Sequence, residues 1–478
     1  MVRRALLASA LCGTLASCEV GPDFHLPEMA LFNAREAQGD FVSEHDAAFS
    51  KGALPAHWWR LYRDPVLDRL IADAFAANTD LREAAANLER THALLQQARV
   101  ARQPSVVFNY DPEFGRISAE EFLQPHLIPT AVFYDLGLSA SYEVDLFGRL
   151  QRGIEAAEAS DEAAIAARDV ARVTVAASVT SAYTDLCGAT EELEAAKRLV
   201  ALQRQRYAYV RKLLVAGRGT PIETTQNRGQ VSQVESQLPV FVARQRNARF
   251  RLAVLTGRPP EGSPTALVQC NAAPILASPI PVGDGAALLH RRPDIREAER
   301  TLAASTAEIG VATADLYPRV SLGVAIGSTG VMQDFLEPLT NRYSVGPGIT
   351  WQLNQSEARA RIDEAEAETR GELARFDGVV LNALKETETA LNNYARALQR
   401  DARLEAVRDR AKETFVYLSR LETGGRNDSL STLDAARALA STQLALAESR
   451  SEVSSAQVAV FLALGGGWED QPKDATHP

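Results

Sequence analysis

One stretch of the sequence decides the fold: AVFYDLGLSASYEVDLFG at residues 131–148. Apolar side chains alternate with small or polar ones from residue 132 to residue 146, which is the period of a β-strand with one apolar face. Soluble strands are most often about 5–6 residues long, whereas alternating segments of about ten residues are what a transmembrane β-barrel requires. The residues that we expect on the lipid-facing side of this strand are Val132, Tyr134, Leu136 and Leu138.

Three further segments show the same alternation, at residues 105–110, 320–327 and 343–353. Four strands cannot close a barrel, because the smallest transmembrane barrels have about eight. Open sheet edges are also not tolerated in lipid. The chain must therefore oligomerise to close a barrel if it spans a membrane. The alternative interpretation of the alternation is the edge of a soluble β-sandwich.

Each pair of strands is followed by a very long helical segment without proline, at residues 149–214 and 357–420. Apolar residues recur at seven-residue spacing in both segments, which is typical of coiled coils. At about 1.5 Å per residue, such a helix is about 100 Å long. Glycine-rich turns follow at 217–219 and 424–425, and shorter helices return over 222–255 and 430–463. Two more helices are expected over 66–102 and 294–316.

The body of the chain reads as a duplication. Landmarks such as Tyr142 and Trp351, or Gly217 and Gly425, recur at an offset of about 210 residues. The fold class is therefore mixed α and β, with four transmembrane strands and long coiled-coil helices in each protomer. The expected organisation is a signal peptide (1–17), an extended N-terminal segment (18–65), a first repeat (66–257), a linker (258–292), a second repeat (293–466) and a polar tail (467–478).

Charge and motifs argue against several classes of function. The 478 residues carry a formal net charge of -10, which opposes binding to nucleic acid. The seven histidines show no metal-binding spacing, and no nucleophile elbow, P-loop or dinucleotide motif occurs. We therefore expect no enzyme activity, cofactor or metal.

Two motifs allow alternative interpretations. Residues 290–294 are either an anion site or, as we favour, the start of a helix at Pro293. For Trp58 and Trp59 we favour packing over ligand stacking.

The N-terminus has the features of an export signal. Arg3 and Arg4 precede a short apolar run over 5–16, which is too short to span a membrane. Small residues then precede Cys18, as in a bacterial lipobox, so we expect Cys18 to be acylated. The alternative is a chance cysteine in an ordinary signal peptide. Cys187 and Cys270 remain, either paired in an oxidising compartment or separately buried.

Five motifs occur in order along the chain: CEVGPDFHLP at 18–27, WWRLYRDPVL at 58–67, YEVDLFGR at 142–149, LLHRRPDIREAE at 288–299 and LGGGW at 464–468. Together they resemble the motifs of the TolC-like outer-membrane factors, the NodT-like lipoproteins of resistance-nodulation-division (RND) type tripartite efflux pumps. The resemblance extends from residue 18 to about residue 468, essentially the whole mature chain.

This resemblance implies a homotrimer in which twelve strands close one β-barrel in outer-membrane lipid and the helices continue it as a periplasmic α-barrel. The implied partners are a periplasmic adaptor protein and an inner-membrane RND-type pump, and no nucleic acid is implied. The implied function is passive conduction of small molecules, such as drugs and toxic compounds, to the exterior. The location would be the outer membrane, with a lipid anchor on Cys18 and an extension into the periplasm. The alternative is a lipid-anchored periplasmic coiled-coil structural protein.

The two glycine-rich turns are the predicted periplasmic end of the channel. The residues expected to contact the adaptor are Gly217, Gly219, Gly424 and Gly425, and the gate candidates are Arg218, Arg426, Asn427 and Asp428. Asp428 has an alternative role as the N-cap of the following helix. The chain departs from the family pattern at the acidic gate position, which is Asn427 here. It departs again at residues 353–357, where the family's glycine turn is missing.

Replacing Cys18 by serine should abolish acylation and the processing of the signal peptide, because the thiol is the atom that receives the lipid. Mass spectrometry of the mature N-terminus measures both events. An unmodified cysteine at the N-terminus of the parent protein would contradict the anchor.

Overall fold

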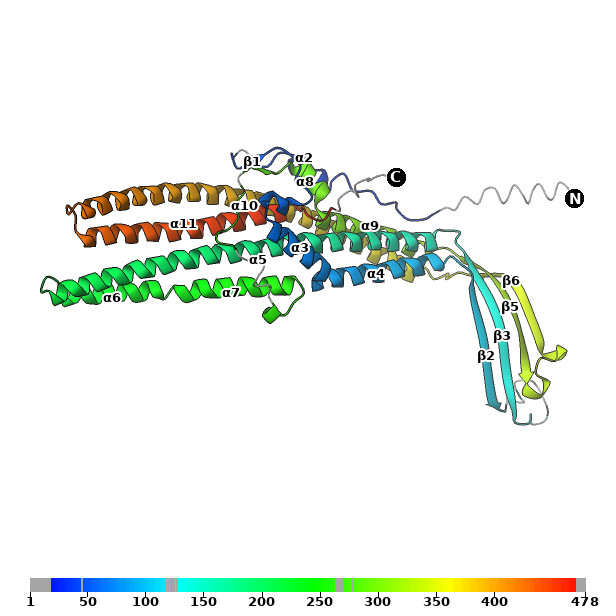
Figure 1. The fold of residues 1–478 in the computed structure, drawn as a ribbon. Coiled ribbons are helices and arrows are strands. Elements are labelled where there is room, and N and C mark those ends of the chain that lie inside the picture. The colour runs from blue at the N-terminus through cyan, green and yellow to red at the C-terminus, as the bar shows by residue number, and fades with distance from the viewer. Residues whose placement is uncertain are drawn as a thin grey trace, which may run out of the picture. The chain divides into compact units, whose positions relative to one another are not determined.

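A computed structural model describes residues 19–469, apart from 44–45, 117, 119, 121–124, 126–127, 263–269 and 277 (Figure 1). The expected signal peptide and Cys18 lie outside the described residues. The fold is mixed α and β, as predicted. The chain forms two compact units. The strand unit consists of residues up to Pro27, Asn87–Ala164 and Glu297–Phe376, and the hairpin unit of Glu28–Ala86, Ile165–Arg296 and the residues from Asp377 onward. Each unit takes segments from both sequence repeats.

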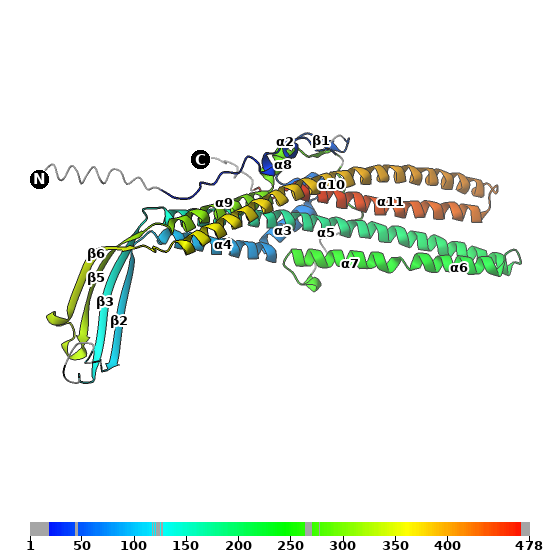
Figure 2. The same cartoon turned by 180° about the vertical axis from the view of Figure 1, so that it is seen from behind.

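The strand unit contains an antiparallel sheet of four strands in the order β2-β3-β5-β6, which lie side by side in Figures 1 and 2. Their bounds are β2 (Ser105–Gly115), β3 (Ala131–Val144), β5 (Arg319–Val331) and β6 (Asn341–Thr350). The register places Phe108, Leu138, Ile326 and Tyr343 in one row across the sheet. All four predicted strands are confirmed. Two short 3₁₀ helices, η4 (Met332–Asp334) and η5 (Pro338–Thr340), lie between β5 and β6.

Four helices complete the strand unit. They are α4 (Thr79–Val100), α5 (Arg149–Val215), α9 (Pro293–Ala314) and α10 (Ser356–Thr423), and each of them also has residues in the hairpin unit. Polar contacts join them in pairs. Thr91 of α4 donates to Asp161 of α5 over 3.2 Å, and Thr369 of α10 donates to the Ser305 carbonyl of α9 over 3.1 Å.

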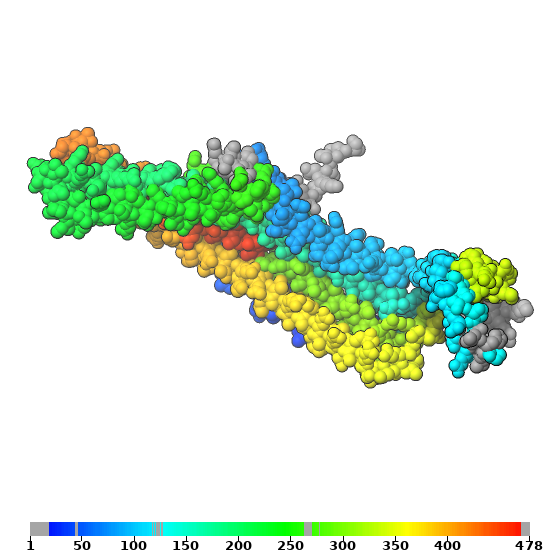
Figure 3. Space-filling view, turned by 90° about the horizontal axis from the view of Figure 1, so that it is seen from below, coloured from blue at the N-terminus to red at the C-terminus, as the bar shows by residue number. Residues whose placement is uncertain are grey.

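The hairpin unit contains two antiparallel helical hairpins, seen from behind in Figure 2. The first is formed by α5 with α6 (Pro221–Glu235) and α7 (Leu238–Leu255), and the second by α10 with α11 (Ser429–Ala463). In Figure 3, α6 and α7 form one continuous green ridge, and red α11 lies alongside α7. The helix predicted over 222–255 is in fact two helices. They separate at Ser236 and Gln237 because Pro239, in the first turn of α7, has no N–H to continue the earlier helix.

The helix predicted over 66–102 is also divided, into α3 (Pro65–Ala77) and α4. Asn78 causes the division, because its side-chain oxygen accepts from the Asp80 N–H over 2.9 Å and so caps α4. Its amide donates to the Leu255 carbonyl over 3.0 Å, which ties this corner to the end of α7.

The core of the hairpin unit is built around Trp58, which is completely buried. Its ring stacks on Phe461 with centroids 4.4 Å apart, and its indole N–H donates to the Gly466 carbonyl over 3.2 Å. The predicted packing role of the tryptophan pair is confirmed. Around this core lie η1 (Leu31–Asn33), α2 (Arg35–Gln38), β1 (Phe49–Ser50), η2 (Trp58–Tyr62), η3 (Pro260–Gly262), β4 (Ile280–Pro281) and α8 (Gly285–Arg291).

The segment 290–294 is a helix boundary, as we favoured over an anion site. α8 ends at Arg291 and α9 begins at Pro293. The buried Arg292 between them pairs with Asp294 over 2.7 Å and with Glu386 of α10 over 3.0 Å. The guanidinium also donates to the Ala463 carbonyl at the end of α11 over 2.7 Å. Arg292 therefore ties the start of α9 to both helices of the second hairpin.

Cys187 of α5 and Cys270 form a disulfide, with Cα atoms 5.1 Å apart. The sequence left their pairing open, and the structure shows that they meet. The bond fixes the segment before β4 against α5. On the same segment, Ser454 of α11 donates to the Pro274 carbonyl over 2.8 Å. The linker is thus held by both hairpins.

Glycines with left-handed backbone end the helices of both hairpins. Gly217 (φ 72°) and Gly425 (φ 66°) end α5 and α10, and Gly257 (φ 69°) ends α7. A side chain at Gly257 would place its Cβ 2.5 Å from the Ala77 carbonyl oxygen, whereas nothing lies within 4 Å of a Cβ at Gly217. The two positions share a backbone conformation and differ in their surroundings.

Gly217→Ala should cost about 1 kcal/mol, because only the left-handed backbone penalises it. Gly257→Ala should cost a further ~1–3 kcal/mol, because the α3–α7 corner must also move. Thermal unfolding of the two variants, followed by circular dichroism, gives the comparison. Equal losses would mean that the Ala77 contact has no effect on stability.

Candidate functional site

One face of the sheet carries a broad apolar surface. We call it the apolar sheet face: Val106, Phe108, Tyr110 and Phe114 of β2, Val132, Leu136, Leu138 and Tyr142 of β3, Leu322, Val324 and Ile326 of β5, and Tyr343, Val345 and Ile349 of β6. Phe108 is 67% exposed and Tyr343 is 87% exposed. A contiguous apolar surface of this extent is unfavourable in water and marks a surface that contacts lipid or protein.

The opposite face is polar and lined by small side chains. A hollow of about 490 Å³ lies on it, bordered by residues that include Asn109, Asp111 and Ser139. Arg342 crosses this face and forms an ion pair with Asp135. Gly327 makes room for it, because a Cβ at Gly327 would lie 3.1 Å from the guanidinium nitrogen Nε of Arg342. The alternation read from the sequence thus separates an apolar from a polar surface.

Tyr134 does not fit the predicted lipid-facing set. It lies on the apolar side of β3, but only 2% of it is exposed. The connection between β5 and β6 covers it: Phe335 packs on its ring with centroids 4.9 Å apart, and its hydroxyl lies 2.7 Å from the Ser328 hydroxyl. Alternation assigned Tyr134 to the face on which it lies, but it does not show what folds over that face. Lipid contact of the four predicted residues remains a prediction.

Both edges of the sheet are open in the described part of the chain. There β2 pairs only with β3, and β6 pairs only with β5. All of β6 and nearly all of β2 is exposed. The sheet therefore presents two long rows of backbone N–H and C=O groups, which form ready partners for further strands.

Residues 19–27, which we call the N-terminal strap, dock onto the strand unit through Arg152 of α5. The buried Arg152 guanidinium donates to the Val20 carbonyl over 3.1 Å and to the Asp23 carboxylate over 2.7 Å. It also pairs with Glu155 over 2.7 Å. Ion pairing with Arg152 lowers the pKa of Asp23. Sequence reasoning missed Arg152. The available signal was a single arginine placed one turn after the YEVDLFGR motif.

Two of the sequence motifs meet at this strap. The Val20 N–H donates to the Phe147 carbonyl over 3.2 Å. Gly148 has φ 77°, and a Cβ there would lie 2.9 Å from the Glu19 side chain. A Cβ at Gly21 would lie 2.4 Å from Gly310 of α9. These glycines allow the strap to lie in close contact with α5 and α9, directly beyond the predicted anchor residue.

The two hairpin turns have matching geometry. Each long helix ends with a glycine in the left-handed conformation followed by an arginine. The Arg218 N–H donates to the Leu213 carbonyl, and the Arg426 N–H donates to the Leu421 carbonyl, each over 2.8 Å. This Schellman pattern satisfies the carbonyls at the helix ends. Gly219 and Gly424, the other predicted adaptor contacts, lie beside these two glycines in the same turns.

Asp428 caps α11. Its carboxylate accepts from the Ser431 N–H over 2.9 Å and from the Ser431 hydroxyl over 2.6 Å. These hydrogen bonds lower the pKa of Asp428. The Asn427 side chain donates to the Thr432 hydroxyl over 3.1 Å. The capping role considered for Asp428 is present in the structure, and the gate role of Asn427 and Asp428 remains a prediction.

Arg206 connects the two hairpins, and sequence reasoning did not single it out. It pairs with Asp434 of α11 over 2.5 Å and also contacts Asn227 of α6. Its partners come from segments far apart in the sequence, so helical periodicity contained no signal for the contact.

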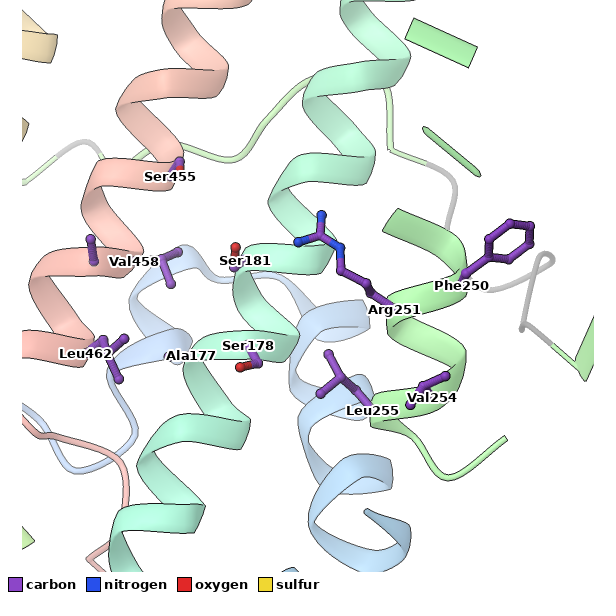
Figure 4. Close-up of a pocket in the computed structure, with 11 residues that line it drawn as sticks. Ala177, Ser178, Ser181, Phe250, Arg251, Val254, Leu255, Ser455, Val458 and Leu462 are labelled. Carbon is purple, nitrogen blue, oxygen red and sulfur yellow. The ribbon is translucent and has the colours of Figure 1, made fainter. Parts of the chain in front are cut away.

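An apolar groove of about 640 Å³ lies between α5, α7 and α11. Its lining includes Ala177, Val254 and Leu462 (Figure 4). Arg251 extends from α7 toward α5, where it pairs with Asp185 over 2.5 Å, and Phe250 points away.

Among the described residues, no cluster of three or more acidic, histidine or cysteine side chains is arranged to bind a metal. None of the described helices has the length and apolarity to cross a membrane.

Comparison with known proteins identifies relatives over nearly the whole chain. The model of the outer membrane efflux protein family matches residues 70–258 and 286–466. The chain is 30% identical to the pyoverdine export outer membrane protein OpmQ of Pseudomonas putida, over 88% of this chain and 90% of that protein. It is 26% identical to the cation efflux system protein CusC of Escherichia coli O6:H1, over 97% and 99%. The solved structure of the outer-membrane channel OprN matches with a TM-score of 0.83 and 32% identity, over 94% and 100%.

Two substitutions at Asp428 separate a cap from a charged gate. Asparagine also caps helices, so Asp428→Asn should leave thermal stability unchanged, whereas Asp428→Ala should lower it. The stability difference between the parent and the alanine variant should be largest above the carboxyl's unfolded pKa and should shrink as the pH falls through its lowered folded pKa. Single-channel recordings with divalent cations test the gate. A change of block in Asp428→Asn, without loss of stability, would show that the charge acts in the gate.

Proposed function

The chain belongs to the outer membrane efflux protein family, and on that basis we propose that three copies assemble into the outer-membrane channel of a tripartite efflux system. An efflux channel of the outer membrane is the function that its family and its relatives share. The trimeric assembly, the lipid anchor and the partners of this chain are the proposed parts.

The observation that carries the proposal is the sheet with one exposed apolar face and two open edges. In lipid each unpaired backbone group costs several kcal/mol, so a spanning sheet must close on itself. The edge of β6 in one copy is free to pair with the edge of β2 in the next. Three copies give twelve antiparallel strands, an even number within the range of about 8–26 found in bacterial barrels. The apolar sheet face would then contact lipid and the polar face would line the lumen.

The lumen supports passive conduction of small molecules. The relatives are named for cargoes as different as pyoverdine and cations, and a polar lining with rows of small side chains suits such variety. In the proposed assembly an inner-membrane RND-type pump supplies energy and selects the substrate, and a periplasmic adaptor contacts the hairpin turns at Gly217, Gly219, Gly424 and Gly425. Gate candidates at that end are Arg218, Arg426, Asn427 and Asp428.

The N-terminal strap supports an anchor on Cys18. Arg152 and Gly148 hold Val20 and Glu19 against the start of α5, a few residues after β3 ends at Val144. A lipid on the residue before Glu19 would therefore lie close in sequence to the docked strap and next to the strand ends. This arrangement supports a proposed location in the outer membrane, with an extension into the periplasm.

Neighbouring residues on opposite faces of β3 test the barrel. Leu138→Arg places a charge on the apolar sheet face and should cost about 2–4 kcal/mol near the middle of the bilayer. Ser139→Arg lies one residue further, on the polar face, and should assemble nearly normally. Heat-labile trimers counted in the outer-membrane fraction, and conductance in planar bilayers, measure the outcome. Equal damage from both substitutions, or a parent protein without conductance, would favour the periplasmic structural alternative.

A further inference from the structure

The connection between β5 and β6 folds back over the apolar sheet face. It covers Tyr134, whose partners in the register are Pro112 of β2 and Gly330 of β5. A Cβ at Gly330 would lie 2.7 Å from the Thr340 methyl group, so Thr340 can pack against β5 only because this position is a glycine. Figure 1 shows this connection beside the ends of β5 and β6.

The Tyr134 hydroxyl holds the connection at several points. It lies 2.7 Å from the Ser328 hydroxyl and 3.1 Å from the Thr340 hydroxyl. It also accepts from the Leu336 N–H over 3.0 Å. The Thr340 hydroxyl in turn donates to the Glu337 carbonyl over 2.9 Å. The polar groups beneath the connection therefore satisfy one another through a single tyrosine.

Leu336 shows that the connection is held in a fixed shape. Its φ of 62° is in the left-handed region, which branched and bulky residues seldom adopt. Such a conformation persists only when its surroundings determine it. Here the hydrogen bond from its own N–H to Tyr134 does so.

The outer side of the connection is apolar. Phe335 is 43% exposed, Leu336 is 52% exposed and Leu339 is fully exposed. Asp334 and Glu337 are exposed beside them. Three apolar side chains with flanking carboxylates would be unusual on a loop that projects into water. They lie over the Tyr134 row and add to the apolar sheet face near this end of the strands.

The height of the sheet places this connection at a membrane boundary. From Val144 to Tyr134, β3 rises by about 3.4 Å per residue, or roughly 34 Å along the strand. With the tilt of 35–45° usual in barrels, this is about 24–28 Å of height, close to the ~25 Å apolar band. If the apolar band begins where β3 ends at Val144, the Tyr134 row reaches its far boundary.

We propose that the β5–β6 connection is an interfacial lipid anchor, in which Phe335, Leu336 and Leu339 insert at the boundary between head groups and acyl chains of the outer leaflet. Tyr134 is the positioning residue that holds the anchor against the barrel wall. The inference rests on the proposed barrel, and its occupant is lipid because the connection is continuous with the lipid-facing surface. The anchor would fix how deeply the barrel lies in the bilayer, at the end of the strands opposite the proposed lipid on Cys18.

The test measures the depth of single fluorescent labels in the full-length protein. Cysteine is introduced by Leu339→Cys, Leu138→Cys or Ser139→Cys and labelled with an environment-sensitive dye, with the parent protein as the labelling blank. The proteins are reconstituted into phosphatidylcholine–phosphatidylglycerol vesicles that contain lipids spin-labelled near the head group or near the chain end. Aqueous iodide reports exposure to water.

We expect the label at 339 to be quenched mainly by the head-group-proximal spin label and the label at 138 mainly by the deeper one. The label at 139 should respond to iodide alone. If the spin-labelled lipids quench the label at 138 but the label at 339 responds only to iodide, the connection projects into water. That result would contradict the proposed anchor and would leave the proposed barrel supported. Protection of 339 from both quenchers would indicate contact with a neighbouring protomer and would also overturn the anchor. If 138 is not quenched by lipid, the barrel itself fails.

Tyr134→Phe tests the positioning role with little change in shape. Without the hydroxyl, Leu336 loses its acceptor, so shallow quenching of the 339 label should fall by about half and iodide quenching should rise. Deep quenching of the 138 label in the same background should be unchanged, which shows that the barrel is intact. Unchanged shallow quenching at 339 in Tyr134→Phe would show that the tyrosine does not hold the anchor.

Discussion

Two open sheet edges constrain the rest of the structure. A backbone N–H or C=O left unpaired in lipid costs several kcal/mol, and β2 and β6 each expose a full row of such groups. The cost is removed only if each edge pairs with an edge of another copy. The apolar sheet face adds the hydrophobic term, which favours lipid over water. In the proposed barrel, the same four strands would therefore link assembly to membrane insertion.

The helices continue this duplicated plan, with one asymmetry. Both long helices end in the same Schellman turn, at Gly217 and at Gly425. The returning helices differ, because Pro239 divides α6 from α7 whereas α11 is unbroken. The first hairpin therefore has an interruption that the second lacks. The Arg206–Asp434 ion pair and the Cys187–Cys270 disulfide are further features that occur once and not twice. The two sequence repeats share the same order of helices and turns, and they differ in the contacts that join the two hairpins.

Local patterns predicted the elements well, because strands and helices depend on nearby residues. Two-residue alternation identified β3, and the absence of proline identified α5 and α10 nearly to their ends. The glycine turns were also read correctly. Local patterns did not predict the contacts that distant segments make. Tyr134 is buried by residues about 200 positions later, and Arg152 holds a strap about 130 positions earlier. The pairing of Cys187 with Cys270 is another contact between distant segments. Periodicity contains no information about which surfaces meet.

Small residues form two rows of the polar face, next to the Arg342–Asp135 ion pair. Across the sheet, Ser139 aligns with Val107, Ala325 and Ser344, and Ser141 aligns with Ser105, Gly323 and Gly346. In the proposed barrel, side chains of this size would leave the lumen wide at these two rows. Strong selectivity requires convergent polar groups in a confined pocket, and the lining of these rows does not supply them. Such rows would suit the proposed system, in which another component chooses the cargo. Register is then the property of β3 that matters most, because a shift by one residue would exchange the polar face with the apolar sheet face.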